Sequence, residues 1–260
     1  MAADLYAAML AKCAPEGTTW EIVFPSDPGV ELPQDGTLGS YDGIAWTGCS
    51  LCLNDGSAEI QKQVEFARAA FAAGVPGFGS CWAAQIAVAA AGGRIETNPR
   101  GREMGIARKI QLTPIGRSHP LYEGKPTVFD AFISHDDEIT HLPPGALCLA
   151  TNAWTGVQAV CVTYLGTQFW AVQYHPEYDL HELARLTHCR IEKLIRLGFF
   201  NSEKAAHQYV DLLETLHEDP SRNDIAWLLG IDADVMNEDV RLAEVRNWVG
   251  RLVLPGMRQR

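Results

Sequence analysis

A cysteine at a sharp turn and a histidine–glutamate pair far downstream are the residues of this chain best suited to chemistry. The stretch VPGFGSCWAAQ (75–85) reads as an apolar strand, a small-residue turn and an Ala-rich helix, with Cys81 at the apex. The start of a helix favours the thiolate form of such a cysteine. The stretch WAVQYHPE (170–177) is an apolar strand that ends in His175 and Glu177. Together these residue types predict a nucleophile, a general base and a residue that orients the base.

Each of these residues also has a plainer interpretation. Cys81 is also consistent with a small buried apolar residue. His175 is also consistent with a structural histidine, and Glu177 with a cap on the following turn. The chemical interpretation is favoured because residues two apart on an extended strand end share a face, so the side chains of His175 and Glu177 lie together. Pro176 between them fixes the local turn.

Composition narrows the class of protein. The chain has 260 residues, 47% of them hydrophobic, and a formal net charge of -11. This charge argues against nucleic-acid binding and against docking on anionic membranes. No run approaches the roughly 18 apolar residues of a membrane span, and the N-terminal residues lack the basic start and apolar centre of a signal peptide.

The cysteines indicate a reducing compartment. There are seven, an odd number without a disulfide framework, so we expect a cytoplasmic protein. Cys49 and Cys52 form a CxxC, but no second pair or nearby histidine completes a metal site, so we interpret the spacing as chance and expect no metal.

The order of elements predicts an α/β fold. Up to about residue 200, apolar strand-like runs alternate with helical segments, which is typical of a three-layer, mostly parallel sheet flanked by helices. Reactive groups in such sheets gather beyond the carboxyl ends of the strands, where Gly48, Cys81 and His175 all fall. We expect helices over 4–14, 57–73 and 82–91, and strands over 20–24, 43–46, 75–78, 106–112, 127–133, 146–152, 158–164 and 169–174.

The remainder of the chain is predicted to be helical. Segments 181–197, 202–217 and 238–252 have helical patterns with no strand between them. We therefore expect an α/β domain over 1–180 and a helical C-terminal extension over 181–260 that packs on it. Trp227 and Trp248 are expected to be packing anchors within the extension.

Four patches in order resemble the class I (Cys-His-Glu triad) glutamine amidotransferase family, in particular the branch similar to the glutaminase domain of GMP synthase. They are Thr47-Gly48, the elbow Gly79–Gln85, the segment Ser134–Glu138, and Tyr174–Glu177. The stretch from Gly92 to Glu103 adds to the likeness. The resemblance covers residues 1–180, which it implies are a catalytic domain of flavodoxin-like type.

The resemblance implies a role for each matched residue. Cys81 would attack the γ-carbonyl of a glutamine-like substrate, His175 would relay a proton to the leaving amine, and Glu177 would orient His175. The backbone N–H groups of Gly48 and Trp82 would form the oxyanion hole. The residues that would meet the glutamyl group are Gln85, Ser134, His135 and Asp136. No cofactor is implied.

Several positions keep an alternative open. His135 beside Asp136 and Asp137 has the composition of a metal ligand, although we favour a polar loop that lines the pocket. The side chain of Trp82 is equally suited to the pocket mouth and to the core. Arg100, Arg102 and Glu103 are expected to lie in a solvated loop.

The chain departs from the family pattern in three places. The family elbow reads Gly-x-Cys-x-Gly, whereas Ala83 and Ala84 follow Trp82 here, so local geometry is expected to shift. Family members open with a buried strand, whereas this chain begins at the first helix, which implies a missing strand or a start upstream. The helical extension is the third departure.

These features favour a hydrolase of γ-glutamyl amides. The chain shows no ATP-binding motif, and the reshaped elbow suggests a leaving amine larger than ammonia. The segment Asp224–Val235 also resembles amidotransferase-like proteins of aniline degradation, which implies γ-glutamylanilide as a substrate. A glutamine-synthetase-like enzyme of the same pathway and a homo-oligomer are left open as partners. The rival hypotheses are a glutaminase subunit that delivers ammonia to a separate synthetase, and a non-catalytic relative.

Overall fold

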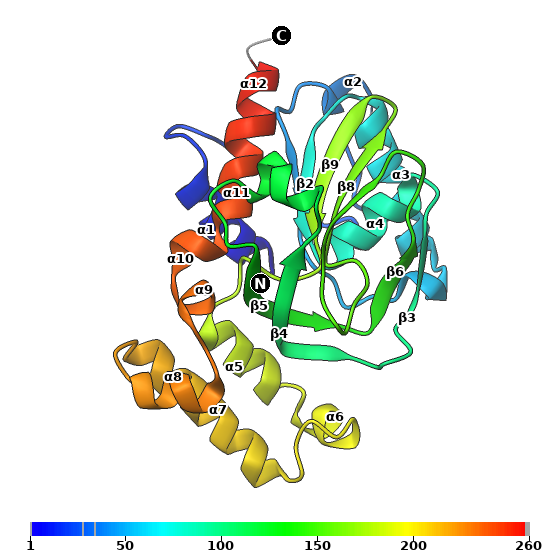
Figure 1. The fold of residues 1–260 in the computed structure, drawn as a ribbon. Coiled ribbons are helices and arrows are strands. Elements are labelled where there is room, and N and C mark those ends of the chain that lie inside the picture. Colours follow the sequence, from blue (N-terminus) through cyan, green and yellow to red (C-terminus); the bar gives the residue numbers. More distant parts are fainter. Residues whose placement is uncertain (1, 28, 34, 258–260) are drawn as a thin grey trace.

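A seven-stranded sheet organises the molecule. The computed structural model describes residues 2–27, 29–33 and 35–257. The strand order is β1-β2-β9-β8-β7-β4-β5 (Figure 1). The strands of this sheet are β1 (Ile44–Trp46), β2 (Gly77–Ser80), β4 (Glu103–Leu112), β5 (Val128–His135), β7 (Leu147–Thr151), β8 (Ala159–Tyr164) and β9 (Thr167–Val172).

The α/β class is confirmed, but the sheet is mixed rather than mostly parallel. β2 pairs in parallel with β1 and with β9, whereas the pairings among β9, β8, β7, β4 and β5 are antiparallel. Short connections explain the antiparallel pairings of β7 with β8 and of β8 with β9, because parallel neighbours need a long crossover. Leu165 and Gly166 alone join β8 to β9, and both have positive φ, 51° and 82°, as the tight hairpin turn requires.

Helices cover both faces of the sheet, as the three-layer prediction required. On one face α3 (Ala58–Ala72) and α4 (Trp82–Ala90) pack into a core that includes Phe71, Ile86 and Phe169. On the other face α1 (Ala2–Cys13) and α11 (Ala243–Trp248) pack into a second core. Figure 1 shows α3 and α4 on one side of the strands and α1 with α11 on the other.

A small second sheet was missed. β3 (Arg94–Thr97) and β6 (Asp137–His141) pair antiparallel, so the segment after Ser134 is a strand rather than a loop. The strand predicted over 20–24 is absent, because this stretch has no regular structure. Trp20, Ile22 and Phe24 are more than 40% exposed. The stretch has a strand-like composition, but no strand formed by the described residues pairs with it.

The predicted helix over 181–197 is broken in two. It forms α5 (Leu180–His188) and α6 (Ile191–Arg196), separated at Arg190, whose φ of -125° and ψ of 15° are not helical. The other helical elements are α2 (Asp35–Leu38), α7 (Glu203–Glu218), α8 (Asn223–Leu229), α9 (Ala233–Met236), α10 (Glu238–Arg241), α12 (Leu254–Met257), and the short turns η1 (Leu53–Asp55), η2 (Gly116–Ser118), η3 (Pro120–Tyr122) and η4 (Val249–Val253).

The C-terminal helices fall into two groups. α5, α7, α8 and α9 share a third core with Phe132 of β5, and Figure 1 shows α5 to α8 below the sheet. α11 and η4 instead return to the main sheet, where Trp248 is buried as predicted. Trp227 is not a packing anchor, because its side chain is 89% exposed while Ile225 is the buried residue of α8. The division at residue 180 stays a prediction.

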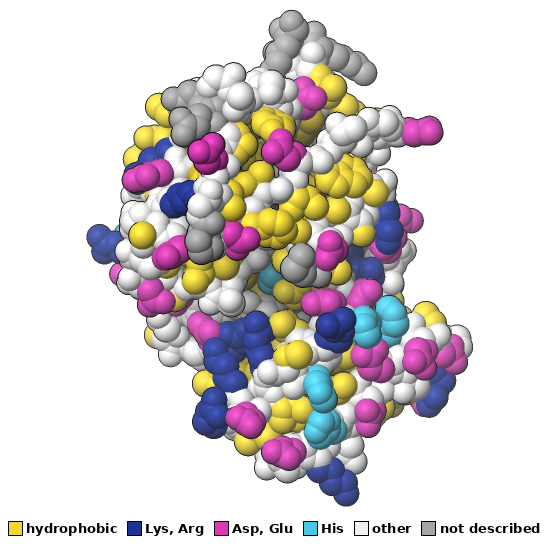
Figure 2. All heavy atoms as spheres, turned by 180° about the vertical axis from the view of Figure 1, so that it is seen from behind, with side chains coloured by type: hydrophobic (Ala, Val, Ile, Leu, Met, Phe, Trp, Pro, Cys, Tyr) yellow, Lys and Arg dark blue, Asp and Glu magenta, His cyan; other side chains and the backbone are white. Residues whose placement is uncertain are grey.

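Histidines are concentrated in the lower helical region, as the rear view in Figure 2 shows. Their rings form two loose pairs, His181 with His217 and His188 with His207, each with centroids 5.5 Å apart. Among the described helices, none has both the length and the apolar character needed to cross a bilayer.

Candidate active site

The turn after β2 presents Cys81 to a cavity. Cys81 joins β2 directly to α4 with φ of 53° and ψ of -101°, a conformation that costs about 1–3 kcal/mol in a residue with a side chain. Its backbone N–H donates to the carbonyl oxygen of Val172 in β9 at 2.8 Å, which holds the strained residue against the sheet. The predicted elbow is therefore present, with the cysteine at its apex.

The elbow depends on a close contact between the strand and the helix. A Cβ added to Gly79 would lie 2.3 Å from the Cβ of Ala83 and 2.3 Å from the carbonyl oxygen of Trp46. Residue 79 must therefore lack a side chain. The methyl group of Ala83 fits because glycine stands opposite it.

His175 and Glu177 meet beyond the end of β9. The Nδ1 atom of His175 lies 2.7 Å from Oε1 of Glu177, and both side chains are 3% exposed. Because a carboxylate only accepts, Nδ1 carries the proton. The Cys81 thiol, which acts on the pKa of His175, donates to the carbonyl oxygen of Ser134 at 3.7 Å. The ring of Tyr178 stacks on the imidazole with centroids 4.0 Å apart and an interplanar angle of 7°.

The electrostatics favour a charged imidazole. Burial by itself lowers the pKa of His175, but the Glu177 carboxylate and the Cys81 sulfur outweigh burial and raise the pKa to about 10. An imidazolium flanked by a carboxylate and a sulfur is the arrangement that stabilises a thiolate.

A buried chain of hydroxyl groups supports Glu177 from behind. Tyr6 of α1 donates to the Ser80 hydroxyl at 2.5 Å, and Ser80 donates to Oε1 of Glu177 at 2.9 Å. Burial and the Glu177 carboxylate raise the pKa of Tyr6 well above its usual value, so the phenol stays protonated and donates. The position of Ser80 next to Cys81 was the only signal for this chain in the sequence.

Gly48 and Trp82 lie next to Cys81. A Cβ built on Gly48 would lie 3.7 Å from the Cβ of Cys81 and 2.9 Å from Cε1 of His175, so this glycine approaches both residues closely. Trp82 is the first residue of α4. In the described part of the chain, no acceptor takes the backbone N–H of Gly48 or of Trp82. Two unpaired donors at this position suit an oxyanion.

The indole of Trp82 faces the core. Its side chain is buried and its Nε1 donates to Oε1 of Gln63 at 2.7 Å. Gln85, one turn later, lines the cavity, and its Nε2 donates to the Asp137 carbonyl at 3.1 Å.

His135 is engaged on both ring nitrogens. Nδ1 lies 2.8 Å from the Asp137 carbonyl oxygen, and Nε2 lies 3.2 Å from Oε2 of Glu103. The metal-ligand alternative left open for His135 would require one of these bonds to break.

Arg102 and Glu103 are part of the site rather than of a solvated loop. The Arg102 side chain is 7% exposed, pairs with the Asp136 carboxylate, and donates to the Ser134 hydroxyl at 2.7 Å. Glu103 accepts from partners fifty residues later in the chain, Asn152 at 2.6 Å, Thr155 at 2.8 Å and Gln158 at 2.9 Å. Burial alone raises the pKa of Glu103, but hydrogen bonds from His135, Asn152 and Thr155 outweigh it and lower the pKa.

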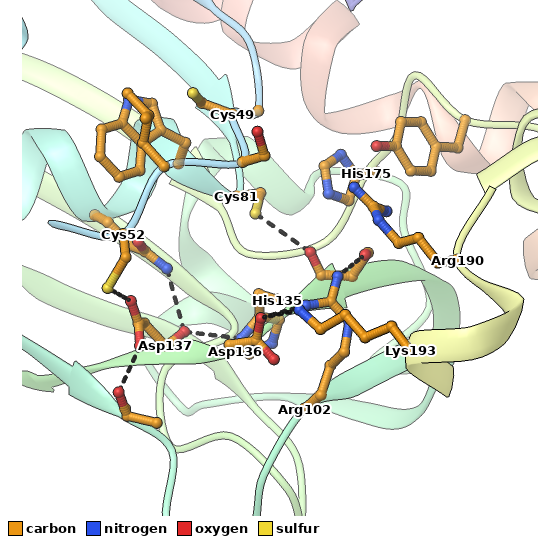
Figure 3. A pocket seen from close by; sticks show the side chains of 18 residues that line it. Cys49, Cys52, Cys81, Arg102, His135, Asp136, Asp137, His175, Arg190 and Lys193 are labelled. Carbon is orange, nitrogen blue, oxygen red and sulfur yellow. Dashed lines mark hydrogen bonds and ion pairs between the residues drawn. The ribbon is translucent and has the colours of Figure 1, made fainter. Parts of the chain in front are cut away.

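The cavity itself measures about 500 Å³ and receives residues from both parts of the chain, within the roughly 300–1,000 Å³ usual for small-molecule sites. Figure 3 shows Cys81 between two unlike walls. Cys49 and Cys52 lie on one side, and Arg190 and Lys193 of the α5–α6 region lie on the other. These two cations were not anticipated. All nine predicted site residues lie in or beside this cavity, and their catalytic and binding roles stay predictions.

The chain is similar to known proteins over the region that contains these residues. Residues 51–187 match the family model described as glutamine amidotransferase class-I. A γ-glutamyl-L-1-hydroxyisopropylamide hydrolase from a Pseudomonas species is 35% identical over 243 residues, which are 90% of this chain and 80% of that protein. The GMP synthase of Nitrosomonas eutropha is 35% identical over 111 residues, but these cover 21% of that synthase. A solved glutamine amidotransferase from Methylobacillus flagellatus has the same fold, with a TM-score of 0.63 at 20% identity over 94% of this chain and 88% of that one.

Proposed function

This chain belongs to the class I glutamine amidotransferase family, and from that premise we propose that it is a hydrolase that cleaves the amide bond of γ-glutamyl amides. One observation carries the proposal. Cys81, at the apex of the elbow, and the hydrogen-bonded pair His175–Glu177 meet at one wall of a cavity of about 500 Å³.

The first half of the reaction forms a thioester. The Cys81 sulfur attacks the γ-carbonyl carbon, and the carbonyl electron pair moves onto oxygen, where the N–H groups of Gly48 and Trp82 hold it. The C–N bond then breaks as the oxyanion collapses. His175 gives its proton to the departing nitrogen, and Glu177 holds the imidazole in the required tautomer.

The second half releases glutamate. Water attacks the thioester carbon, His175 accepts a proton from that water, and the C–S bond breaks. The products are glutamate and the free cysteine, so no cofactor or net redox change is needed.

The glutamyl group is held by residues on both sides of Cys81 in the cavity. We assign its contacts to Gln85, Ser134 and Asp136, which line the cavity beside Cys81. His135 acts through the backbone, because its Nδ1 is bonded to the Asp137 carbonyl at 2.8 Å.

The amine that leaves is larger than ammonia. The relative that aligns over 90% of this chain is named for a hydroxyisopropylamide, and the cavity of about 500 Å³ holds more than the ten non-hydrogen atoms of glutamine, since a single water molecule occupies only about 30 Å³ in the liquid. N-alkyl γ-glutamyl amides and γ-glutamylanilide are the substrates to test.

The proposed reaction also points to a partner enzyme and to a cellular location. Condensing glutamate with an amine requires activation of the γ-carboxylate, which an ATP-dependent ligase of the glutamine-synthetase kind supplies, so we propose such an enzyme as the functional partner. The seven cysteines are all free, which supports a cytoplasmic location.

A second candidate function has one observation in its favour. The match to GMP synthase supports a glutaminase subunit that passes ammonia to a separate synthetase. This alternative predicts hydrolysis of glutamine alone, and only when a synthetase partner is present.

A hydrolysis panel distinguishes the two. Glutamine, γ-glutamylethylamide, γ-glutamylanilide and γ-glutamyl-hydroxyisopropylamide would be incubated with the wild type, Cys81→Ala, and the control Cys148→Ala, which removes a half-buried thiol of β7. We expect N-substituted amides to be cleaved by the wild type and the control, and by Cys81→Ala not at all. Turnover of glutamine alone, or activity that survives in Cys81→Ala, contradicts the proposal.

A further inference from the structure

Arg190 is a cation in the wall of the cavity that forms no ion pair with any described residue. It lies at the break between α5 and α6 and lines the same cavity as Cys81 and His175. Within the described residues, no oxygen accepts a hydrogen bond from its guanidinium group. Figure 3 shows this side chain directed toward His175 across the cavity.

The nearby carboxylates are already used by other groups. Asp136 pairs with Arg102 and, at 3.3 Å, with Lys193. Asp137 accepts from the Thr97 hydroxyl at 2.9 Å and from the Cys52 thiol at 3.0 Å.

Arg190 is only partly compensated by its surroundings. Burial and the neighbouring Arg102 lower the pKa of Arg190 and outweigh Tyr178, Cys189 and Asp136, which act in the opposite direction, as expected when a cation is desolvated beside a like charge. A half-buried guanidinium with five donors and no acceptor is stabilised when a carboxylate binds it through two parallel hydrogen bonds.

We infer that Arg190 binds a carboxylate group of the substrate. Arg190 lies outside residues 51–187, which match the family model, so a residue beyond that segment sets the preference for anionic ligands. This inference rests on the proposed function for the identity of the substrate. Two sources of carboxylate exist in a γ-glutamyl amide. Every such amide carries the α-carboxylate of glutamate, and an amino-acid leaving group carries a second one.

Three substrates separate these sources. They are γ-glutamylethylamide, its analogue N-ethyl-4-aminobutanamide, which lacks the α-carboxylate, and γ-glutamylglycine, whose leaving amine bears a carboxylate. The variants are Arg190→Gln, the conservative Arg190→Lys, and the control Arg196→Gln on α6, whose side chain is 70% exposed.

If Arg190 holds the α-carboxylate, Arg190→Gln lowers kcat/KM for both γ-glutamyl substrates by roughly 10- to 100-fold, the usual effect of a charge-assisted hydrogen bond, and leaves the decarboxylated analogue unchanged. If Arg190 holds a carboxylate of the amine, only γ-glutamylglycine is affected. Arg190→Lys retains part of the activity, and Arg196→Gln retains all of it. An equal effect on all three substrates, or no effect, overturns the inference.

A binding measurement separates this inference from the proposed function. Glutarate carries carboxylates but no scissile bond, so calorimetric titration with glutarate needs no turnover. We expect the wild type to bind glutarate at least ten-fold more tightly than Arg190→Gln, even if no γ-glutamyl amide is cleaved. Equal binding by the two proteins, or no binding by the wild type, overturns the inference.

Discussion

The buried pair of His175 and Glu177 makes the stability of the protein depend on pH. Their Nδ1 and Oε1 atoms are 2.7 Å apart and both side chains are 3% exposed. Burial opposes the charged imidazole, but Glu177 and Cys81 outweigh it and raise the pKa of His175 from 6.5 to about 10.

The direction and size of the effect follow from linkage. A histidine whose pKa is higher in the folded state contributes stability that is fully present below the unfolded pKa, near 6.5, and is lost as the pH rises through the folded value, near 10. Between these values the free energy of unfolding should fall by about 1.4 kcal/mol per pH unit, on the order of 5 kcal/mol in total.

Glu177→Gln tests this reasoning because it removes the charge while keeping the shape and an oxygen that accepts from Nδ1. The free energy of unfolding would be measured by urea titration at intervals from pH 6 to pH 10. We expect the stability advantage of the wild type over the variant to shrink by about 1 kcal/mol per pH unit across this range, while the titrations common to both proteins cancel.

The exposed pair His181–Glu214 supplies a matched control. Its atoms are 2.8 Å apart, but its side chains are 46% and 34% exposed, so Glu214→Gln should change stability by less than about 1 kcal/mol at any pH. Parallel pH curves for the wild type and Glu177→Gln would refute the argument, because they would mean that the Glu177 charge does not hold the proton on His175.

Three further substitutions test the surroundings of the site. Gly48→Ala places a methyl group 2.9 Å from Cε1 of His175, so the imidazole must move and kcat/KM should fall about 100-fold; activity within two-fold of the wild type would contradict this close approach. Ser80→Ala removes the hydroxyl that donates at 2.9 Å to the Glu177 carboxylate. We expect a roughly 10- to 100-fold loss of kcat/KM. An unchanged rate and pH–rate profile would show that the hydroxyl is dispensable. Lys125→Met leaves the buried Glu244, 2.5 Å away, without its ion-pair partner, and urea unfolding should show a loss of about 3–5 kcal/mol; a loss below about 1 kcal/mol would mean that the pair is not desolvated in solution.

The placement of Cys81, His175 and Glu177 was the most predictable part of the molecule because its signals are local. A small-residue turn between an apolar run and a helix places Cys81, and a proline at a strand end places the pair around it. The parallel edge of the sheet then brings Gly48, Cys81 and His175 together, since β1, β2 and β9 are neighbours that run in the same direction.

The residues that were misjudged depend on distant partners. A run of charged residues around Arg102 and Glu103 has the composition of a solvated loop. Their burial is decided by Asp136, by Ser134 and by a segment fifty residues later, and no local pattern reports such pairing. Arg190 was hidden in the same way, because the pattern over 181–197 is continuously helical and only the packing of the folded chain shows the break.

The alanine at position 83 of the elbow does not by itself explain which amine the site accepts. The family places glycine two residues after the nucleophile, and here Ala83 stands there. Its methyl group is accommodated because Gly79 has no Cβ, and a Cβ at residue 79 would lie only 2.3 Å away. The strand and helix therefore keep their close crossing, and Cys81 keeps its strained conformation. A change that leaves Cys81 in place has no direct means of selecting one amine over another. Selection must come from the walls that differ from one another, the Cys49–Cys52 side and the Arg190–Lys193 side, and the second lies outside the segment that matches the family.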